Sequence, residues 1–218
     1  MNAIAFLIRL IADRNTTERI EQETGRPLRI GDLGKVLRGH FQRFTIYNPL
    51  ALVAGMVFFA TLIYPWWYAV MYNDLYTVQA FPFILKHSVP LDLGASYIIE
   101  TPPVAVVFLL CLLAVYALIL FWGSTLSGVK GALYVAVAGL CMLLYTAGFY
   151  GSIWYAADHV GMPMTGYSWI FHEVQIDIRM AFTREYSIAI GAGATCLILS
   201  LIHGLLPIRF YRRGRRDT

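Results

Sequence analysis

The residues best suited to chemistry lie in one polar stretch, residues 157–180, of an otherwise apolar chain. This stretch contains two histidines, each next to a carboxylate. Histidine and carboxylate side chains together suit Zn²⁺ or non-haem iron, and three such ligands plus a water would form a catalytic site. The candidate metal ligands are His159, His172, Glu173 and Asp177.

The spacing of these residues argues against a metal enzyme. In the run HEVQI, Ile176 stands where the zinc-protease motif H-E-x-x-H requires its second histidine. No serine, threonine or cysteine lies in a nucleophile motif, and the chain has no glycine-rich phosphate loop. The sequence therefore favours a non-enzymatic protein without a cofactor. A membrane enzyme or metal-dependent factor with its site in this stretch is the alternative.

The second half of the same stretch has the pattern of a β-strand. From Val174 to Met180, apolar residues alternate with Gln175, Asp177 and Arg179. A shorter alternation occurs at residues 89–93. Because an isolated strand has unpaired backbone groups, we expect the two segments to join in a small sheet, whose open edge could pair with a partner. The competing interpretation of the later segment is a helix lying at the membrane surface.

Four uncharged segments are each about long enough to cross a membrane, since roughly 20 residues span the hydrocarbon core. The whole chain is 58% hydrophobic and 14% charged, whereas a soluble domain is about 25% charged. We therefore predict an all-α membrane protein: a four-transmembrane-helix bundle at residues 49–208 with a small extracellular cap. The expected spans are residues 49–72, 103–122, 132–150 and 187–208.

The charges outside these spans predict how the chain is oriented. The N-terminal segment 1–48, the connector 123–131 and the tail 209–218 carry 14 Lys and Arg residues, and loops 73–102 and 151–186 carry 3. The positive-inside rule then places both termini in the cytoplasm and the two loops outside. The predicted location is the cell membrane, with several passes.

The basic residues on the inner side predict contact with lipid and not with nucleic acid. Residues 32–44 have the pattern of a basic amphipathic helix, and the tail is rich in arginine. Both are suited to anionic headgroups of the inner leaflet. The candidate headgroup contacts are Lys35, Arg38, Arg43, Arg209, Arg212 and Arg213.

Small residues in the spans predict where helices approach closely, because lipid gives no hydrophobic drive for helices to associate. The contacts could lie within one chain or between subunits. The candidate packing residues are Gly55, Ala132, Ala136, Gly191, Gly193 and Thr195.

Four spans, cytoplasmic termini and an external sheet built from both loops resemble the claudin-like tetraspan topology. The W-x-x-x-W-C-C signature of claudins is absent and loop 73–102 has no cysteine, so no functional residue is carried over. The leading functional prediction is an oligomerising scaffold, an accessory subunit or a pore-forming component whose external cap makes contacts. Its partners would be a second copy or another membrane protein. A transporter module that works as an oligomer is a further alternative.

Overall fold

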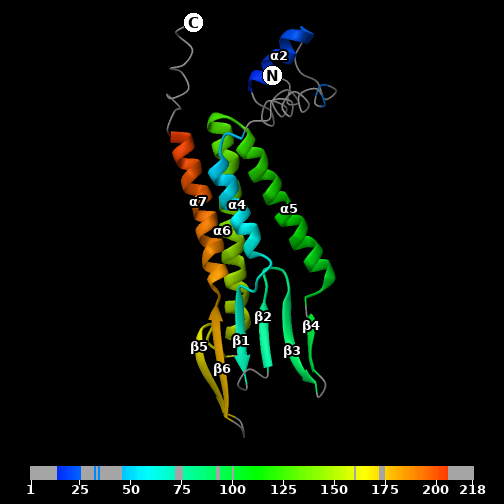
Figure 1. Cartoon of the computed structure of the whole chain (residues 1–218), viewed down its shortest axis with the longest axis vertical. Coiled ribbons are helices and arrows are strands. Elements are labelled where there is room, and N and C mark those ends of the chain that lie inside the picture. Colours follow the sequence, from blue (N-terminus) through cyan, green and yellow to red (C-terminus); the bar gives the residue numbers. More distant parts are fainter. Residues whose placement is uncertain are drawn as a thin grey trace.

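The protein is a bundle of helices that continues at one end into an antiparallel sheet (Figure 1). The computed structural model describes residues 14–25, 32, 34, 46–71, 76–91, 94–99, 101–159, 161–171 and 175–205. The structure is mostly helical, as predicted, but it also contains an antiparallel sheet, so it is not an all-α fold.

Within the ranges that the structure describes, three helices are long and apolar enough to cross a membrane. They run in alternating directions and are joined end to end by short connections or by the strands (Figure 1). Their outward-facing side chains are mostly large and apolar, as expected of a surface in contact with lipid. These helices are α5 (Pro103–Thr125), α6 (Gly128–His159) and α7 (Arg184–Leu205).

The first predicted span is only partly helical. Helix α4 (Pro49–Thr61) begins with the Asn48 side chain accepting the N–H of Ala51, and it ends after 13 residues. At 1.5 Å per residue it is about 20 Å long, shorter than a ~30 Å hydrocarbon core. Pro65 follows closely, and a proline cannot continue the helical hydrogen-bonding pattern. The expected membrane helix over 49–72 is therefore wrong for residues 62–71, and the residues that the structure describes contain three full-length spanning candidates in place of four.

The sheet contains six antiparallel strands in the order β4-β3-β2-β1-β6-β5. Residues of both predicted loops form five of these strands, which confirms the expected small sheet and the strand at β6. Strand β1 comes from the first predicted span, and the external position of the sheet stays a prediction. The strands are β1 (Trp67–Met71), β2 (Tyr76–Ala80), β3 (Leu85–Leu91), β4 (Gly94–Ile99), β5 (Gly166–Phe171) and β6 (Gln175–Phe182).

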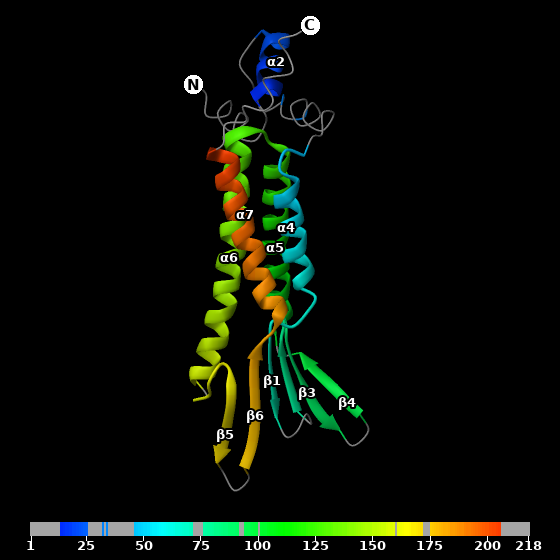
Figure 2. The same ribbon diagram turned by 60° about the vertical axis from the view of Figure 1, so that its left-hand side comes forward.

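Strands β1 and β6 join the two halves of the chain at the centre of the sheet. Each residue of β1 from Trp67 to Met71 lies opposite one of β6 from Phe182 to Ile178. Because β1 follows α4 and β6 leads into α7, this strand pair continues the contact between those two helices (Figure 2). The sheet and the bundle are thus one continuous structure.

An aromatic cluster fills the junction between bundle and sheet. The Trp66 side chain is fully buried, and its indole N–H donates to the Thr61 carbonyl at 3.1 Å. The backbone of Trp66 accepts the Thr183 N–H at 3.0 Å and donates to the Ala80 carbonyl at 2.8 Å. Four aromatic rings surround the indole with centroids 5.2–6.1 Å away: Phe58, Tyr145, Phe149 and Tyr186.

Small residues allow close approach within the bundle. A Cβ on Gly139 of α6 would lie 3.0 Å from the Gly193 carbonyl oxygen of α7, and a Cβ on Gly55 would collide with Leu120. Ala132 is buried and Ala136 half-buried. On α7, Gly193 faces α6, whereas Gly191 and Thr195 are exposed.

At the end opposite the sheet lies the short helix α2 (Arg14–Thr24), which is followed by Gly25 with φ 61°. The predicted amphipathic segment 32–44 lies outside the described residues except for residues 32 and 34. All six predicted headgroup contacts also lie outside the described residues.

Candidate functional site: an apolar cavity between the sheet and helix α6

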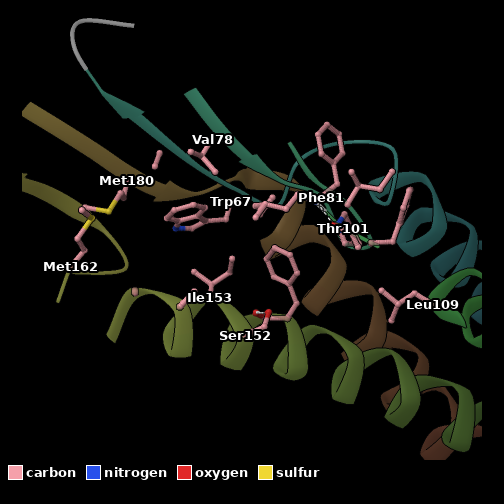
Figure 3. Close-up of a pocket in the computed structure, with 18 of the residues that line it drawn as sticks. Trp67, Val78, Phe81, Thr101, Leu109, Ser152, Ile153, Met162 and Met180 are labelled. Atoms are coloured by element: carbon pink, nitrogen blue, oxygen red, sulfur yellow. Dashed lines mark hydrogen bonds between the residues drawn. The ribbon is translucent and has the colours of Figure 1, made fainter. Parts of the chain in front are cut away.

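A cavity of about 560 Å³ lies between one face of the sheet and the sheet-side end of α6 (Figure 3). The size is within the usual range of ligand pockets, roughly 300–1,000 Å³. Three parts of the chain form its wall. The first is β1, β2 and the 81–85 turn, the second is Thr101 with helix α5, and the third is helix α6 with the start of the following loop and β6.

The alternation of the central strands builds the floor of the cavity. Trp67, Ala69 and Met71 point to the same face of β1, because successive side chains in a strand alternate. Ala69 lies between Val78 of β2 and Met180 of β6 in the register of the sheet. A methyl side chain in the middle of this row leaves the central space open, while the larger neighbours close its sides (Figure 3).

One face of α6 forms the opposite wall. Phe149, Ser152, Ile153, Ala156 and Ala157 line the cavity at intervals of three and four residues, which places them on one side of a helix. The side chains of Ser152, Ala156 and Ala157 are small, so they leave space between the helix and the sheet. The sequence predicts a loop over residues 151–186, and this is wrong for residues 151–159, where α6 continues and forms most of this wall.

The few polar side-chain groups around the cavity already have partners in the protein. The Trp67 indole N–H donates to the Met164 carbonyl at 2.9 Å, and the Ser152 hydroxyl donates to the Phe149 carbonyl at 2.7 Å. The Thr101 hydroxyl oxygen accepts the N–H of Leu85 at 2.8 Å. An occupant gains little from hydrogen bonding here, so the wall is suited to an apolar molecule.

The inner end of the cavity is closed by the aromatic cluster. Phe149 lines the cavity and its ring lies 5.2 Å from that of Trp66. Tyr145 adds a hydroxyl that donates to the Pro82 carbonyl at 2.7 Å, fixing the 81–85 turn to α6. Packed aromatic rings therefore separate the cavity from the core of the helix bundle.

The predicted metal ligands are only partly described. His159 ends α6, and its ring stacks on Tyr155 with centroids 6.2 Å apart. Asp177 lies in β6 opposite Trp169, and His172 and Glu173 lie outside the described residues. Within the described part of the chain, no three His, Cys, Asp or Glu side chains come together in a way that could hold a metal. The metal site stays a prediction.

The cavity was not predicted, although part of its wall had a sequence signal. Residues 67–80 contain two runs rich in aromatic and β-branched residues, separated by Asn73-Asp74. Such a pattern is typical of a β-hairpin. The lack of charge up to residue 72 instead favours the end of a membrane span, and this signal conceals the hairpin pattern. No family model matches the chain, and no curated protein is significantly similar to it in sequence.

Proposed function

We propose that the protein is a non-enzymatic integral membrane protein whose external cap binds the acyl chain of a membrane lipid. The observation that carries this proposal is the apolar cavity of about 560 Å³ beside helices that could cross a membrane. Its walls offer apolar side chains and internally paired polar groups. A hydrocarbon chain is the occupant that such walls favour and that a bilayer supplies at high concentration.

The length of α6 supports a cavity at the membrane surface. At 1.5 Å per residue, its 32 residues extend about 48 Å, and a hydrocarbon core is only ~30 Å thick. The end of α6 that lines the cavity then rises above the core. Tyr150, Trp154 and Tyr155 are exposed there, and aromatic side chains are enriched at membrane interfaces. A lipid in the adjacent leaflet could insert its chain without leaving the membrane.

Helix α4 serves in this proposal as the fourth membrane segment. Its exposed side chains, such as Leu50, Val53 and Met56, are apolar, and it packs between α5 and α7. With four segments both termini lie on the same side. The excess of Lys and Arg near the termini favours the cytoplasm for that side and the exterior for the sheet.

A cavity-filling substitution tests the proposal. Ala156→Phe introduces a ring where α6 faces the sheet, and Ala147→Phe is the matched control at an exposed position of the same helix that does not line the cavity. We expect the affinity for lipid to fall at least about tenfold in Ala156→Phe, because losing two buried methylene groups costs about 1.6 kcal/mol.

Native mass spectrometry of the detergent-purified protein measures the outcome. The wild type and Ala147→Phe should retain a lipid molecule that Ala156→Phe loses. If all three retain the same amount of lipid, or none of them retains any, the acyl chain is not the occupant of this cavity.

A second candidate function is an oligomerising scaffold. Two observations favour it: β4 and β5 are edge strands with one neighbour each, and Ser187, Gly191 and Thr195 form an exposed stripe of small residues on α7. An edge strand can pair with another chain, and small residues let membrane helices approach closely. The two functions are compatible, since neither surface lines the cavity.

A further inference from the structure

A second cavity of about 410 Å³ adjoins the first on the other side of the 162–165 loop. Ala157 and Met162 line both cavities, so the two spaces are separated by little more than these side chains. The loop is held at both ends. The N–H of Gly161, at φ 67°, donates to the Asp158 carbonyl at 3.1 Å, and the Met164 carbonyl accepts the Trp67 indole.

The second cavity differs from the first in its chemistry. Its lining includes the acidic residue Asp158 and the aromatic residues Tyr150, Trp154 and Phe182, with Thr165 on the loop. The rings of Tyr150 and Phe182 are stacked with centroids 5.5 Å apart. Tyr150 is 46% exposed and Trp154 is 55% exposed, so a ligand can contact both residues, on Tyr150 away from the face that stacks on Phe182.

Aromatic faces around a carboxylate attract a cation. The face of an aromatic ring is negative and binds ammonium groups, most strongly when several rings surround one cation. Among the residues that the structure describes, no lysine or arginine forms an ion pair with the carboxylate of Asp158. Within this part of the chain its negative charge is therefore not neutralised by an ion pair, and an ammonium group beside it would be attracted.

The cavity walls disfavour an anionic headgroup. No Lys, Arg or His is present among the described residues that line either cavity. A headgroup with a net negative charge would have no cationic partner here and would be repelled by Asp158, whereas in a zwitterionic headgroup an ammonium group next to Asp158 offsets the phosphate. The headgroup that fits this end carries an ammonium group.

We infer that the second cavity binds the ammonium headgroup of the lipid whose acyl chain occupies the first. The inference rests on the proposed function for the chain and adds the class of headgroup. The acyl chain would extend past Met162 into the apolar cavity. The headgroup would lie on the other side of Met162, next to Asp158 and the three aromatic rings. Asp158 determines the headgroup preference, and the apolar cavity determines that a chain binds at all.

The test compares two single-chain lipids with the same acyl chain. Lysophosphatidylcholine and lysophosphatidylglycerol are each titrated onto delipidated full-length protein, and binding is followed by native mass spectrometry. We expect the wild type to prefer lysophosphatidylcholine, and Asp158→Asn to bind it about tenfold more weakly, since a charged partner contributes about one factor of ten. Asp158→Asn should leave lysophosphatidylglycerol binding unchanged or improved. Glu23→Gln in α2 is the matched control, because Glu23 is exposed and lies at the other end of the bundle.

Each result separates the two proposals. If Asp158→Asn leaves the binding of both lipids unchanged, or weakens both equally, the headgroup inference is wrong while the chain cavity stands. If Ala156→Phe binds both lipids as the wild type does, the chain cavity is wrong. Tetramethylammonium alone is the third probe: should it bind as tightly as the lysolipid in both the wild type and Ala156→Phe, the occupant is a free ammonium compound and not a lipid.

Discussion

Trp66 and Trp154 are two tryptophans that the fold uses in opposite ways. Trp66 is fully buried where α4, α6, α7 and the sheet meet, and its indole N–H has a carbonyl partner. Trp154 is 55% exposed on α6. Tryptophan is enriched at membrane–water interfaces, so residue type alone would suggest this position for both. Only Trp154 has the exposure that such a position needs.

At this scale we predict that Trp66→Ala destabilises the protein by about 3–5 kcal/mol, the usual cost of emptying a buried aromatic site. Trp154→Ala, the matched control, should change stability by no more than about 0.5 kcal/mol, as exposed substitutions do. Thermal unfolding in detergent compares the two. Equal losses would show that Trp66 is not a central packing residue of the junction.

Helix α7 has two faces with different partners. Gly193, Ala189 and Cys196 are buried against the bundle, whereas Gly191 and Thr195 face outward. On α6, a Cβ at Gly139 would lie 3.0 Å from backbone atoms of α7, which cannot move aside as a flexible side chain can. The packing of α6 on α7 therefore depends on the absence of a side chain at this glycine.

At the element scale, Gly139→Leu should destabilise the fold by about 1–3 kcal/mol or more through overpacking. Gly191→Leu should leave the fold intact, because no atom lies within 4 Å of its Cβ position. If the exposed stripe of α7 is the subunit contact of the second candidate function, Gly191→Leu should also reduce the size of the particle in detergent. An unchanged particle would exclude this face as the contact.

The whole molecule places the sheet at one end of the bundle and the α5–α6 connection at the other (Figure 1). Tyr167 is exposed on β5, and Val129 is exposed at the first turn of α6. These two positions therefore report on opposite ends of the molecule. The charge distribution favours the exterior for the first and the cytoplasm for the second.

In a protein with its three cysteines replaced by alanine, Tyr167→Cys should react with a membrane-impermeant maleimide in intact cells. Val129→Cys should react only after the membrane is opened. Labelling of both positions from the outside, or of Val129→Cys alone, would contradict the proposed orientation.

The periodicity and charge of the sequence alone determined the type and approximate position of several helices and of one strand. The uncharged runs predicted α5, α6 and α7 because a membrane helix must be apolar over its whole length. The alternation from Val174 to Met180 predicted β6, since side chains of a strand point to opposite faces in turn. Both signals are local, and both could be detected without knowledge of the fold.

The tertiary structure alone decided where the apolar segments stop being membrane helices and what they enclose. Residues 62–71 carry no charge, like the helix before them, and residues 67–71 form a strand because β6 and β2 pair with them. The same pairing puts Ala69 opposite the small residues of α6, and the cavity arises between them. A cavity is the space left between segments far apart in the sequence, so no local pattern could indicate it.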